Sequence, residues 1–312
     1  MGKPKTMVSM AHPGLFPAAR IILAALVLAP AGLFANPPPL IEQEQKNPVQ
    51  QGVDAYNQGD FDLAVAYDSY AIRLNPKDAR AYANRGLAYS AKGDDDKAIA
   101  DYSRAIRLDP TRPEPYYDRG NAYGRRGDAA KAIADFTEAI RLDPNDARAY
   151  NNRGQAYSNR GEDALALADF DQAIRLDPKH AKSYYNRGDV RASQGDYGPA
   201  IADFKRAIQL DPNDAGPYND LAWILATCPQ AGLRDGTKAV ENATKACGLT
   251  EWKDPGALDT LAAACAEAGD FDSAVKWEGQ SLATPNLGAK ERADSKFRLA
   301  LYQAQQPYHM EK

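Results

Sequence analysis

The sequence predicts an all-α protein built as a solenoid of helix–turn–helix repeats, and three observations carry this prediction. First, a stretch of sequence recurs with a period of 34 residues, marked by prolines at Pro76, Pro110, Pro144, Pro178 and Pro212. Second, apolar and small residues follow helical spacing in two separate runs of each copy. Third, each run is too short to form a stable helix alone in water. The repeats are therefore expected to bury their apolar faces against their neighbours and to be stable as a stack.

The copy at residues 79–112 shows how each element is predicted. Its first helix has one apolar face, formed by Tyr82, Gly86, Ala88 and Tyr89. This helix is expected to end at Gly93, because glycine adopts the left-handed conformation without strain. The acidic residues that follow can cap the second helix, whose apolar face comprises Ala98, Ile99, Tyr102, Ala105, Ile106 and Leu108. Pro110 ends the second helix, and Gly86 and Ala98 should mark the closest approach of the two helices.

Each copy carries Y-x2-R-G near its start, A-x3-F/Y in its second half and a closing D-P, as in YYDRGNAYGRRGDAAKAIADFTEAIRLDP. This pattern resembles the tetratricopeptide repeat, a helix–turn–helix unit. The resemblance covers about three quarters of the chain. It implies a right-handed superhelical solenoid with a concave groove lined by the first helices.

The repeats divide the chain into regular and divergent parts. Five regular repeats are predicted at residues 45–214, two divergent helix pairs at 215–288 and a capping helix at 289–305. The cap should bury the face formed by Ala293, Phe297, Ala300, Leu301 and Ala304. Residues 227–235 make a turn about five residues longer than usual. The segment 227–255 therefore breaks the repeat more than an end cap requires, and it could form a second binding surface.

The N-terminus has a different composition from the repeats. Lys3, Lys5 and Arg20 precede a short apolar run at residues 21–35, and a proline- and glutamine-rich linker is predicted at 36–48. A basic start followed by a short apolar run indicates a secretory signal at residues 1–35. We therefore expect a periplasmic or secreted protein. An uncleaved anchor in the inner membrane is the alternative, and only then would the membrane be a partner.

Composition limits the classes of function. The net charge of −4 argues against a nucleic-acid partner, which normally meets a basic surface. No nucleophile–base set, phosphate loop or metal-binding spacing occurs, so neither an enzyme, a cofactor, a metal site nor a small-molecule substrate is predicted. The three cysteines, Cys228, Cys247 and Cys265, are expected to be buried core residues. A bond between Cys228 and Cys247 is the alternative.

A row of polar side chains stands two residues before the repeat glycine, at Asn84, Asp118, Asn152 and Asn186. The resemblance implies that this position faces the groove, where an asparagine can both donate to and accept from an extended peptide backbone. Each such bond contributes about 0.5–1.5 kcal/mol, so useful affinity needs several in series. The other predicted groove residues are Arg80, Arg148, Lys182, Tyr117, Asn121 and Tyr185. The alternative is that these side chains only solvate an inner face.

The family includes members with a two-carboxylate clamp for chaperone C-termini, which needs lysine where this chain has Ala83, Tyr117, Asn151 and Tyr185. That clamp is therefore not expected. A second row, Arg85, Arg119, Arg153 and Arg187, occurs in the same four copies that carry Asp101, Asp135, Asp169 and Asp203. Because both rows are missing from the other copies, we predict a structural ion pair between helices, within or between repeats, that recurs along the stack. The alternative is that these arginines face a ligand.

Together these features predict a non-catalytic scaffold in the cell envelope that binds a peptide or helix of a partner protein in the groove. The alternative is a structural or self-associating envelope protein without a specific groove ligand.

Overall fold

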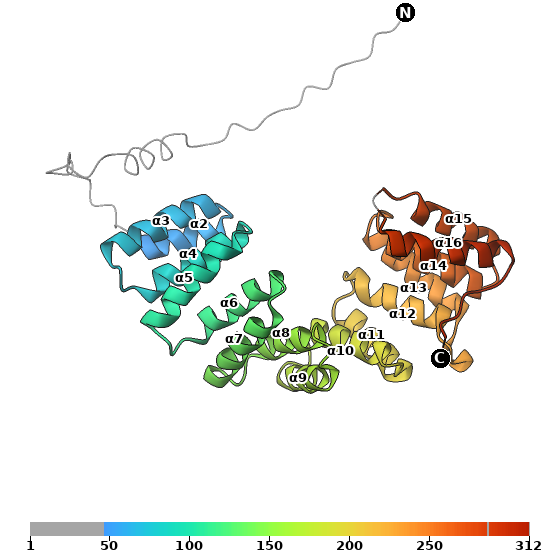
Figure 1. Cartoon of the computed structure of the whole chain (residues 1–312), viewed down its shortest axis with the longest axis horizontal. Helices are drawn as coiled ribbons and strands as arrows, with labels where there is room; N and C mark the ends of the chain where they lie inside the picture. Colours follow the sequence, from blue (N-terminus) through green and yellow to red (C-terminus); the bar gives the residue numbers. More distant parts are fainter. Residues whose placement is uncertain (1–46, 286, 312) are drawn as a thin grey trace, which may run out of the picture. The chain divides into compact units, whose positions relative to one another are not determined.

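The computed structural model describes residues 47–285 and 287–311. The predicted signal at residues 1–35 and nearly all of the linker lie outside this part of the chain. Within it, the chain consists of α-helices, one short 3-10 helix and connecting loops, and no strand is present (Figure 1). The predicted all-α class is confirmed.

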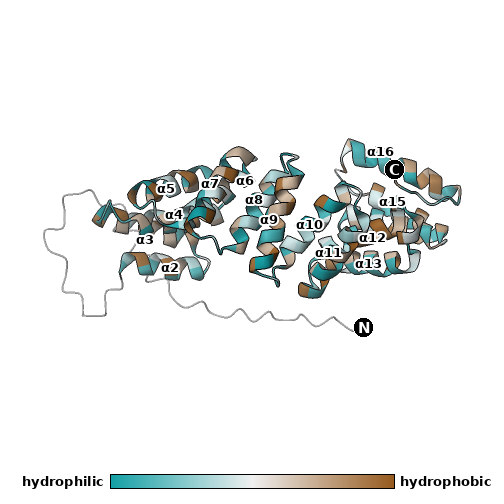
Figure 2. Cartoon of the chain, turned by 90° about the horizontal axis from the view of Figure 1, so that it is seen from below, coloured by the Kyte–Doolittle hydropathy of each residue, from teal (hydrophilic) through white to brown (hydrophobic). Residues whose placement is uncertain are grey.

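Within the described residues, helices α2 to α11 form five antiparallel pairs, each packed on the next. In order they are α2 (Pro48–Asn57) with α3 (Phe61–Leu74), α4 (Ala79–Ala91) with α5 (Asp95–Leu108), α6 (Pro113–Arg125) with α7 (Ala129–Leu142), α8 (Ala147–Ser158) with α9 (Asp163–Leu176), and α10 (Ala181–Ser193) with α11 (Tyr197–Leu210). Figure 2 shows hydrophilic and hydrophobic residues mixed along most helices, as expected where each helix buries only one face.

Two further pairs and a last helix follow. They are α12 (Ala215–Thr227) with α13 (Gly236–Leu249), α14 (Pro255–Glu267) with α15 (Phe271–Leu282), and α16 (Ala289–Gln303). The long turn between α12 and α13 contains the 3-10 helix η1 (Ala231–Leu233). The most extensive buried cluster spans α11 to α16 and is rich in alanine.

Local sequence sets the helix ends. Asp94 and Asp128 cap α5 and α7, where each side chain accepts a hydrogen bond from a backbone N–H in the first turn. Gly93 follows α4 with a φ of +78°, as predicted from its place at the turn. Pro110 follows the end of α5 at Leu108. A glycine with positive φ recurs at Gly59, Gly127, Gly161 and Gly195, so one turn geometry serves the five regular pairs.

A glycine on the first helix faces an aromatic ring on the second. A Cβ atom at Gly86 would lie 2.7 Å from the ring of Tyr102, and one at Gly188 would lie 2.8 Å from Phe204. The close approach predicted at Gly86 is therefore made to the ring of Tyr102, one turn beyond Ala98. Any side chain at this glycine would push the two helices apart.

Both ends of the array replace that aromatic residue with a carboxylic acid. Asp68 lies against Gly52 in the first pair, and Glu278 takes the equivalent place in α15, four residues after Ala274. Both side chains are buried, and none of their carboxyl oxygens has a hydrogen-bond partner among residues 47–285 and 287–311. Burial raises the pKa of Asp68 to about 7, and burial together with the nearby Asp259 carboxylate also raises the pKa of Glu278.

The predicted packing face of the last helix is wrong. Ser295 and Tyr302 of α16 are buried, whereas Phe297 is 59% exposed. The helix turns this way because Arg298 pairs with Asp259 of α14 at 2.7 Å, which brings Tyr302 into the core. The following tail returns over the last helices, where the backbone N–H of Met310 donates to the carbonyl oxygen of Thr227.

All three cysteines are free and buried, as the core interpretation predicted, and Cys228 and Cys247 are not bonded to each other. Burial raises the pKa of the Cys247 and Cys265 thiols to about 11, so both are held as thiols near neutral pH. Among the helices of the described region, none is both long and apolar enough to cross a membrane.

Candidate protein-binding surface

The predicted ion pairs between helices are present in four repeats. Nε of each arginine donates to one carboxylate oxygen at 2.7–2.9 Å and Nη2 to the other at 2.6–2.8 Å. The pairs are Arg85–Asp101, Arg119–Asp135, Arg153–Asp169 and Arg187–Asp203. All four aspartates are buried, so each two-point contact holds an otherwise unpaired charge in the core.

The remaining guanidinium nitrogen, Nη1, reaches the second helix of the preceding repeat. Its partners are Ser69 for Arg85, Ser103 for Arg119, Thr137 for Arg153 and Asp171 for Arg187, at 2.6–3.2 Å. Each arginine thus links three helices and uses all three of its guanidinium nitrogens inside the array. These arginines belong to the scaffold rather than to a ligand site.

The polar row on the first helices is also linked between repeats. Asn152 donates to the Tyr117 hydroxyl at 3.1 Å, Asn186 donates to Asn151 at 3.0 Å, and the Tyr185 hydroxyl donates to Asp220 at 3.0 Å. The first-helix row is therefore Asn84, Asp118, Asn152, Asn186 and Asp220. Asp220 was missed by the sequence reasoning, although it stands 34 residues after Asn186.

These links divide the row into two parts. Asn186 is buried, and Asn152 also donates to Asn121 at 2.8 Å, so both amides already serve the array. Asn84 and Asp118 are half-buried, and their side chains make no hydrogen bond within the described residues. The residue 35 positions before Asp118, at the spacing that elsewhere supplies the partner, is Ala83, whose methyl group cannot form a hydrogen bond.

Most of the predicted site residues come together in two groups, the second of which also contains the unpredicted Asp220. Tyr117, Asp118 and Asn121 of α6 lie beside Arg148 and Asn152 of α8, and the Arg148 guanidinium stands 5.1 Å from the centre of the Tyr117 ring. The second group is Lys182, Tyr185 and Asn186 of α10 with Asp220 of α12, and the Lys182 ammonium stands 4.6 Å from the Tyr185 ring. Arg80 of α4 joins neither group and pairs with its own helix cap, Asp78.

Electrostatics set Asp118 apart. Burial raises the pKa of its carboxyl group to about 6; Arg148 opposes this shift, whereas Glu114 adds to it. Burial also raises the pKa of Asp220, although the hydrogen bond from Tyr185 favours its charged form. Asp118 has no such donor within residues 47–285 and 287–311, so it is the carboxylate of the row best placed to accept a donor from another molecule.

Comparison with known families identifies the repeats. The pattern described as "TPR repeat" matches residues 88–127 and 120–161, and two described as "Tetratricopeptide repeat" match 69–100, 147–180 and 181–214. The chain is a tetratricopeptide repeat protein. Among proteins with curated descriptions, none matches it.

Solved structures show the same fold. PilW, described as a widely conserved type IV pilus biogenesis factor, is 23% identical with a TM-score of 0.60 over 69% of this tetratricopeptide protein and 97% of its own chain. A tetratricopeptide repeat protein from Parabacteroides merdae is 16% identical with a TM-score of 0.55 over 82% and 97% of the two chains.

The Cut9–Hcn1 hetero-tetramer of APC/C contains a chain that is 20% identical with a TM-score of 0.60, over 70% of this tetratricopeptide protein but only 42% of that chain. At these identities the three likenesses show the fold alone, and they agree with the predicted tetratricopeptide solenoid. The repeats themselves support a protein-interaction scaffold with a protein or peptide partner.

Proposed function

We propose that this tetratricopeptide protein is a non-catalytic scaffold of the cell envelope that binds an extended segment of a partner protein across α4, α6 and α8. The observation that carries the proposal is the half-buried carboxyl group of Asp118, which has no hydrogen-bond donor among the described residues. Asn152, Asn186 and Asp220, the later members of the row, each bond to the preceding repeat. The row therefore has its spare hydrogen-bonding capacity at its N-terminal end.

The chemistry of this end suits a peptide backbone. Asp118 can accept from a backbone N–H or a basic side chain, and the amide of Asn84 can both donate and accept. The face formed by Tyr117 and Arg148 can pack against an apolar side chain of the ligand. Each neutral bond contributes about 0.5–1.5 kcal/mol and a bond to a charged group about 1.5–3 kcal/mol, so an extended segment that uses several of them can bind.

Location in the envelope rests on the sequence of residues 1–35, with its basic start and short apolar run. Export can be tested by fusing these residues to alkaline phosphatase, which is active only after transfer to the periplasm. Mass spectrometry of the full-length protein would then separate a signal cleaved after Ala35 from a retained anchor. An inactive fusion that stays in the cytoplasm would contradict envelope location.

Site-specific photo-crosslinking in living cells tests the binding surface. A photo-reactive amino acid would replace Asn121 on α6 in one variant and Leu165, which is 49% exposed on α9, in a matched control. We expect a partner to crosslink at position 121 but not at 165. Equal crosslinking at the two positions, or none at 121, would contradict the proposed surface. A crosslink at 121 between two copies of the chain would instead favour the self-associating role.

A further inference from the structure

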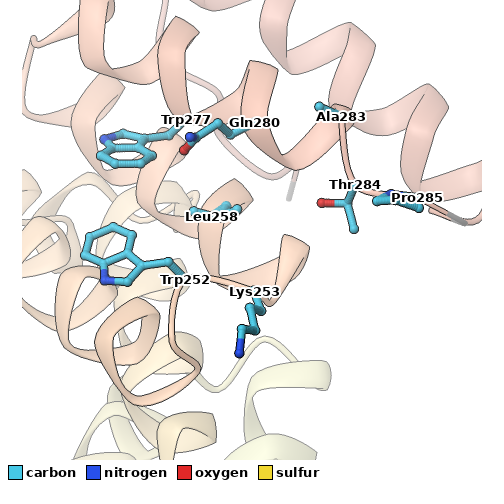
Figure 3. Close-up of a pocket in the computed structure, with 8 residues that line it drawn as sticks. All are labelled: Trp252, Lys253, Leu258, Trp277, Gln280, Ala283, Thr284 and Pro285. Atoms are coloured by element: carbon cyan, nitrogen blue, oxygen red, sulfur yellow. The ribbon is translucent and has the colours of Figure 1, made fainter. Parts of the chain in front are cut away.

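The two divergent helix pairs carry a pocket of about 530 Å³ that no regular repeat requires (Figure 3). Trp252 and Lys253 reach it from the turn after α13, Leu258 from α14, Trp277 and Gln280 from α15, and Pro285 from the loop that follows. The pocket is an open hollow on the surface rather than an enclosed cavity. These four elements converge at one place, so the pocket is built by the divergence of these pairs from the repeat.

The turn after α13 holds Trp252 in an unusual backbone conformation. Glu251 and Trp252 have φ angles of +53° and +61°, which bulky residues rarely adopt. The backbone N–H of Trp252 donates to the carbonyl oxygen of Cys247 at 2.7 Å, which fixes the turn. This turn leaves the Trp252 side chain 44% exposed, at a place where turns usually carry a polar residue. Such conformations cluster at ligand sites.

Trp277 completes an aromatic pair. Figure 3 shows the side chains of Trp252 and Trp277 next to each other. Their indole rings stack, with centres 5.2 Å apart and planes 28° apart. Trp277 occupies the repeat position that carries an aspartate in the four repeats with ion pairs. Leu261 occupies the position of the arginine that pairs with that aspartate. In this pair of helices the ion pair between the two helices is therefore absent, and an aromatic side chain that a ligand could contact stands in its place.

The polar groups around this pair define what could bind. The Lys276 ammonium lies 4.3 Å from the centre of the Trp277 ring and pairs with no carboxylate in the described region. The amide of Gln280 lies beside Trp277 and makes no side-chain hydrogen bond within the same residues. The pocket thus combines apolar walls with a free amide donor. The Lys276 ammonium lies against the Trp277 ring but outside the lining residues, and the lining Lys253 pairs with Glu251.

We propose that this pocket binds a proline-rich segment of a partner protein that carries an acidic residue next to its prolines. Proline rings pack on aromatic side chains, and a proline-rich segment presents carbonyl acceptors while offering few N–H donors. Its carbonyl groups suit the Gln280 amide, and its acidic residue suits the unpaired Lys276. The site lies on the turn after α13, on α14, on α15 and on the loop that follows, and it is separate from the first-helix row, so its occupation does not depend on the proposed function of that row.

The three tryptophans of the chain provide an internal control. The full-length protein would be labelled with 15N-tryptophan and titrated with the acetylated, amidated peptide PPPLPPE, with the indole signals assigned by single Trp→Phe variants. We expect the signals of Trp252 and Trp277 to shift and that of Trp223, which packs against Tyr308, to stay in place. Trp252→Ala should weaken binding at least tenfold. Phe297→Ala, which removes an exposed aromatic side chain outside the pocket, should leave binding unchanged.

Two control peptides test the chemistry of recognition. GSGSGSE keeps the charge without the prolines, and PPPLPPK reverses the charge, so both should bind at least tenfold more weakly than PPPLPPE. Equal binding of GSGSGSE, or no shift of the Trp252 and Trp277 signals at millimolar peptide, would overturn the proposal. Equal binding of PPPLPPK would overturn its acidic element. A concentration-dependent dimer lost in Trp252→Ala would show that the occupant is a second copy of the chain.

Discussion

Nη1 of Arg119 donates to the hydroxyl group of Ser103 across 2.8 Å, and these residues belong to adjacent repeats. The same guanidinium holds Asp135 of its own repeat through two further bonds. One arginine therefore stabilises a repeat and couples it to the repeat before it. Because stacked repeats owe their stability to individual repeats and to the interfaces between them, both contributions can be measured separately.

Arg119→Leu should destabilise the array by about 3–5 kcal/mol, because the buried Asp135 would lose its counter-charge. Urea unfolding followed by circular dichroism measures this loss. The double variant Arg119→Leu/Asp135→Leu should recover most of it, since no unpaired charge remains. Arg126→Leu is the control, because the pair of Arg126 with Asp96 is exposed and should contribute at most about 1 kcal/mol. Equal losses in the Arg119 and Arg126 variants would contradict the argument.

Ser103→Ala should cost about 1.5–3 kcal/mol, the usual range for a hydrogen bond to a charged group, and should weaken the coupling between repeats. Native-state hydrogen exchange would detect this loss at the interface between the repeat of Ser103 and the repeat of Arg119. Backbone amides of the repeats on one side of this interface should exchange faster, and those on the other side should change less. Ser158→Ala is a matched control, because this serine at the end of α8 makes no side-chain hydrogen bond in the described residues. Similar exchange in both variants would show that Arg119 does not couple the repeats.

The sequence predicted the arginine–aspartate pairs because both residues recur in the same copies. It did not predict the third bond, because the partners Ser69, Ser103, Thr137 and Asp171 differ in chemistry although they share the repeat period. What these four residues share is an oxygen that can accept a hydrogen bond from arginine Nη1. A search for polar residues at that period would have found them.

The last helix shows a different limit. Counting apolar residues favoured the face of Ala293 and Phe297, whereas Arg298 and Tyr302 set the packing. An arginine on a buried face is only understood once Asp259 is known to lie opposite it. The tail adds a further cover, since Tyr308 packs against Phe297 with ring centres 6.4 Å apart. The repeat period of the sequence gives no sign that the C-terminal tail folds back in this way.

Asp68→Phe should stabilise the first repeat by about 1–3 kcal/mol, because it removes a buried carboxyl group without a hydrogen-bond partner and restores the aromatic residue of the other repeats. The pKa of Asp68 in the folded protein, about 7, lies above its value in the unfolded chain. Its contribution to stability is therefore fully present below about pH 4 and is lost as the pH rises through 7.

Hydrogen exchange of α2 and α3 from pH 4 to 8 measures this effect locally, once rates are corrected for the intrinsic pH dependence. The wild type should lose protection across this range, and Asp68→Asn, which cannot ionise, should lose less. An identical decline in Asp68→Asn and the wild type would show that another group is responsible. A less stable Asp68→Phe would show that the first repeat has closed around the smaller side chain.

Binding of the partner at the first-helix row should strengthen as the pH rises from 5 to 7. Burial holds the pKa of Asp118 at about 6, and only the ionised carboxylate is a full acceptor for a donor from the ligand. Below pH 6 the affinity should fall by up to about tenfold per pH unit, because binding must first remove the proton. The yield of the crosslink at position 121, measured across this range, reports the effect. Asp118→Asn should flatten the profile, whereas a wild-type yield that is constant or falls from pH 5 to 7 would exclude Asp118 as the acceptor.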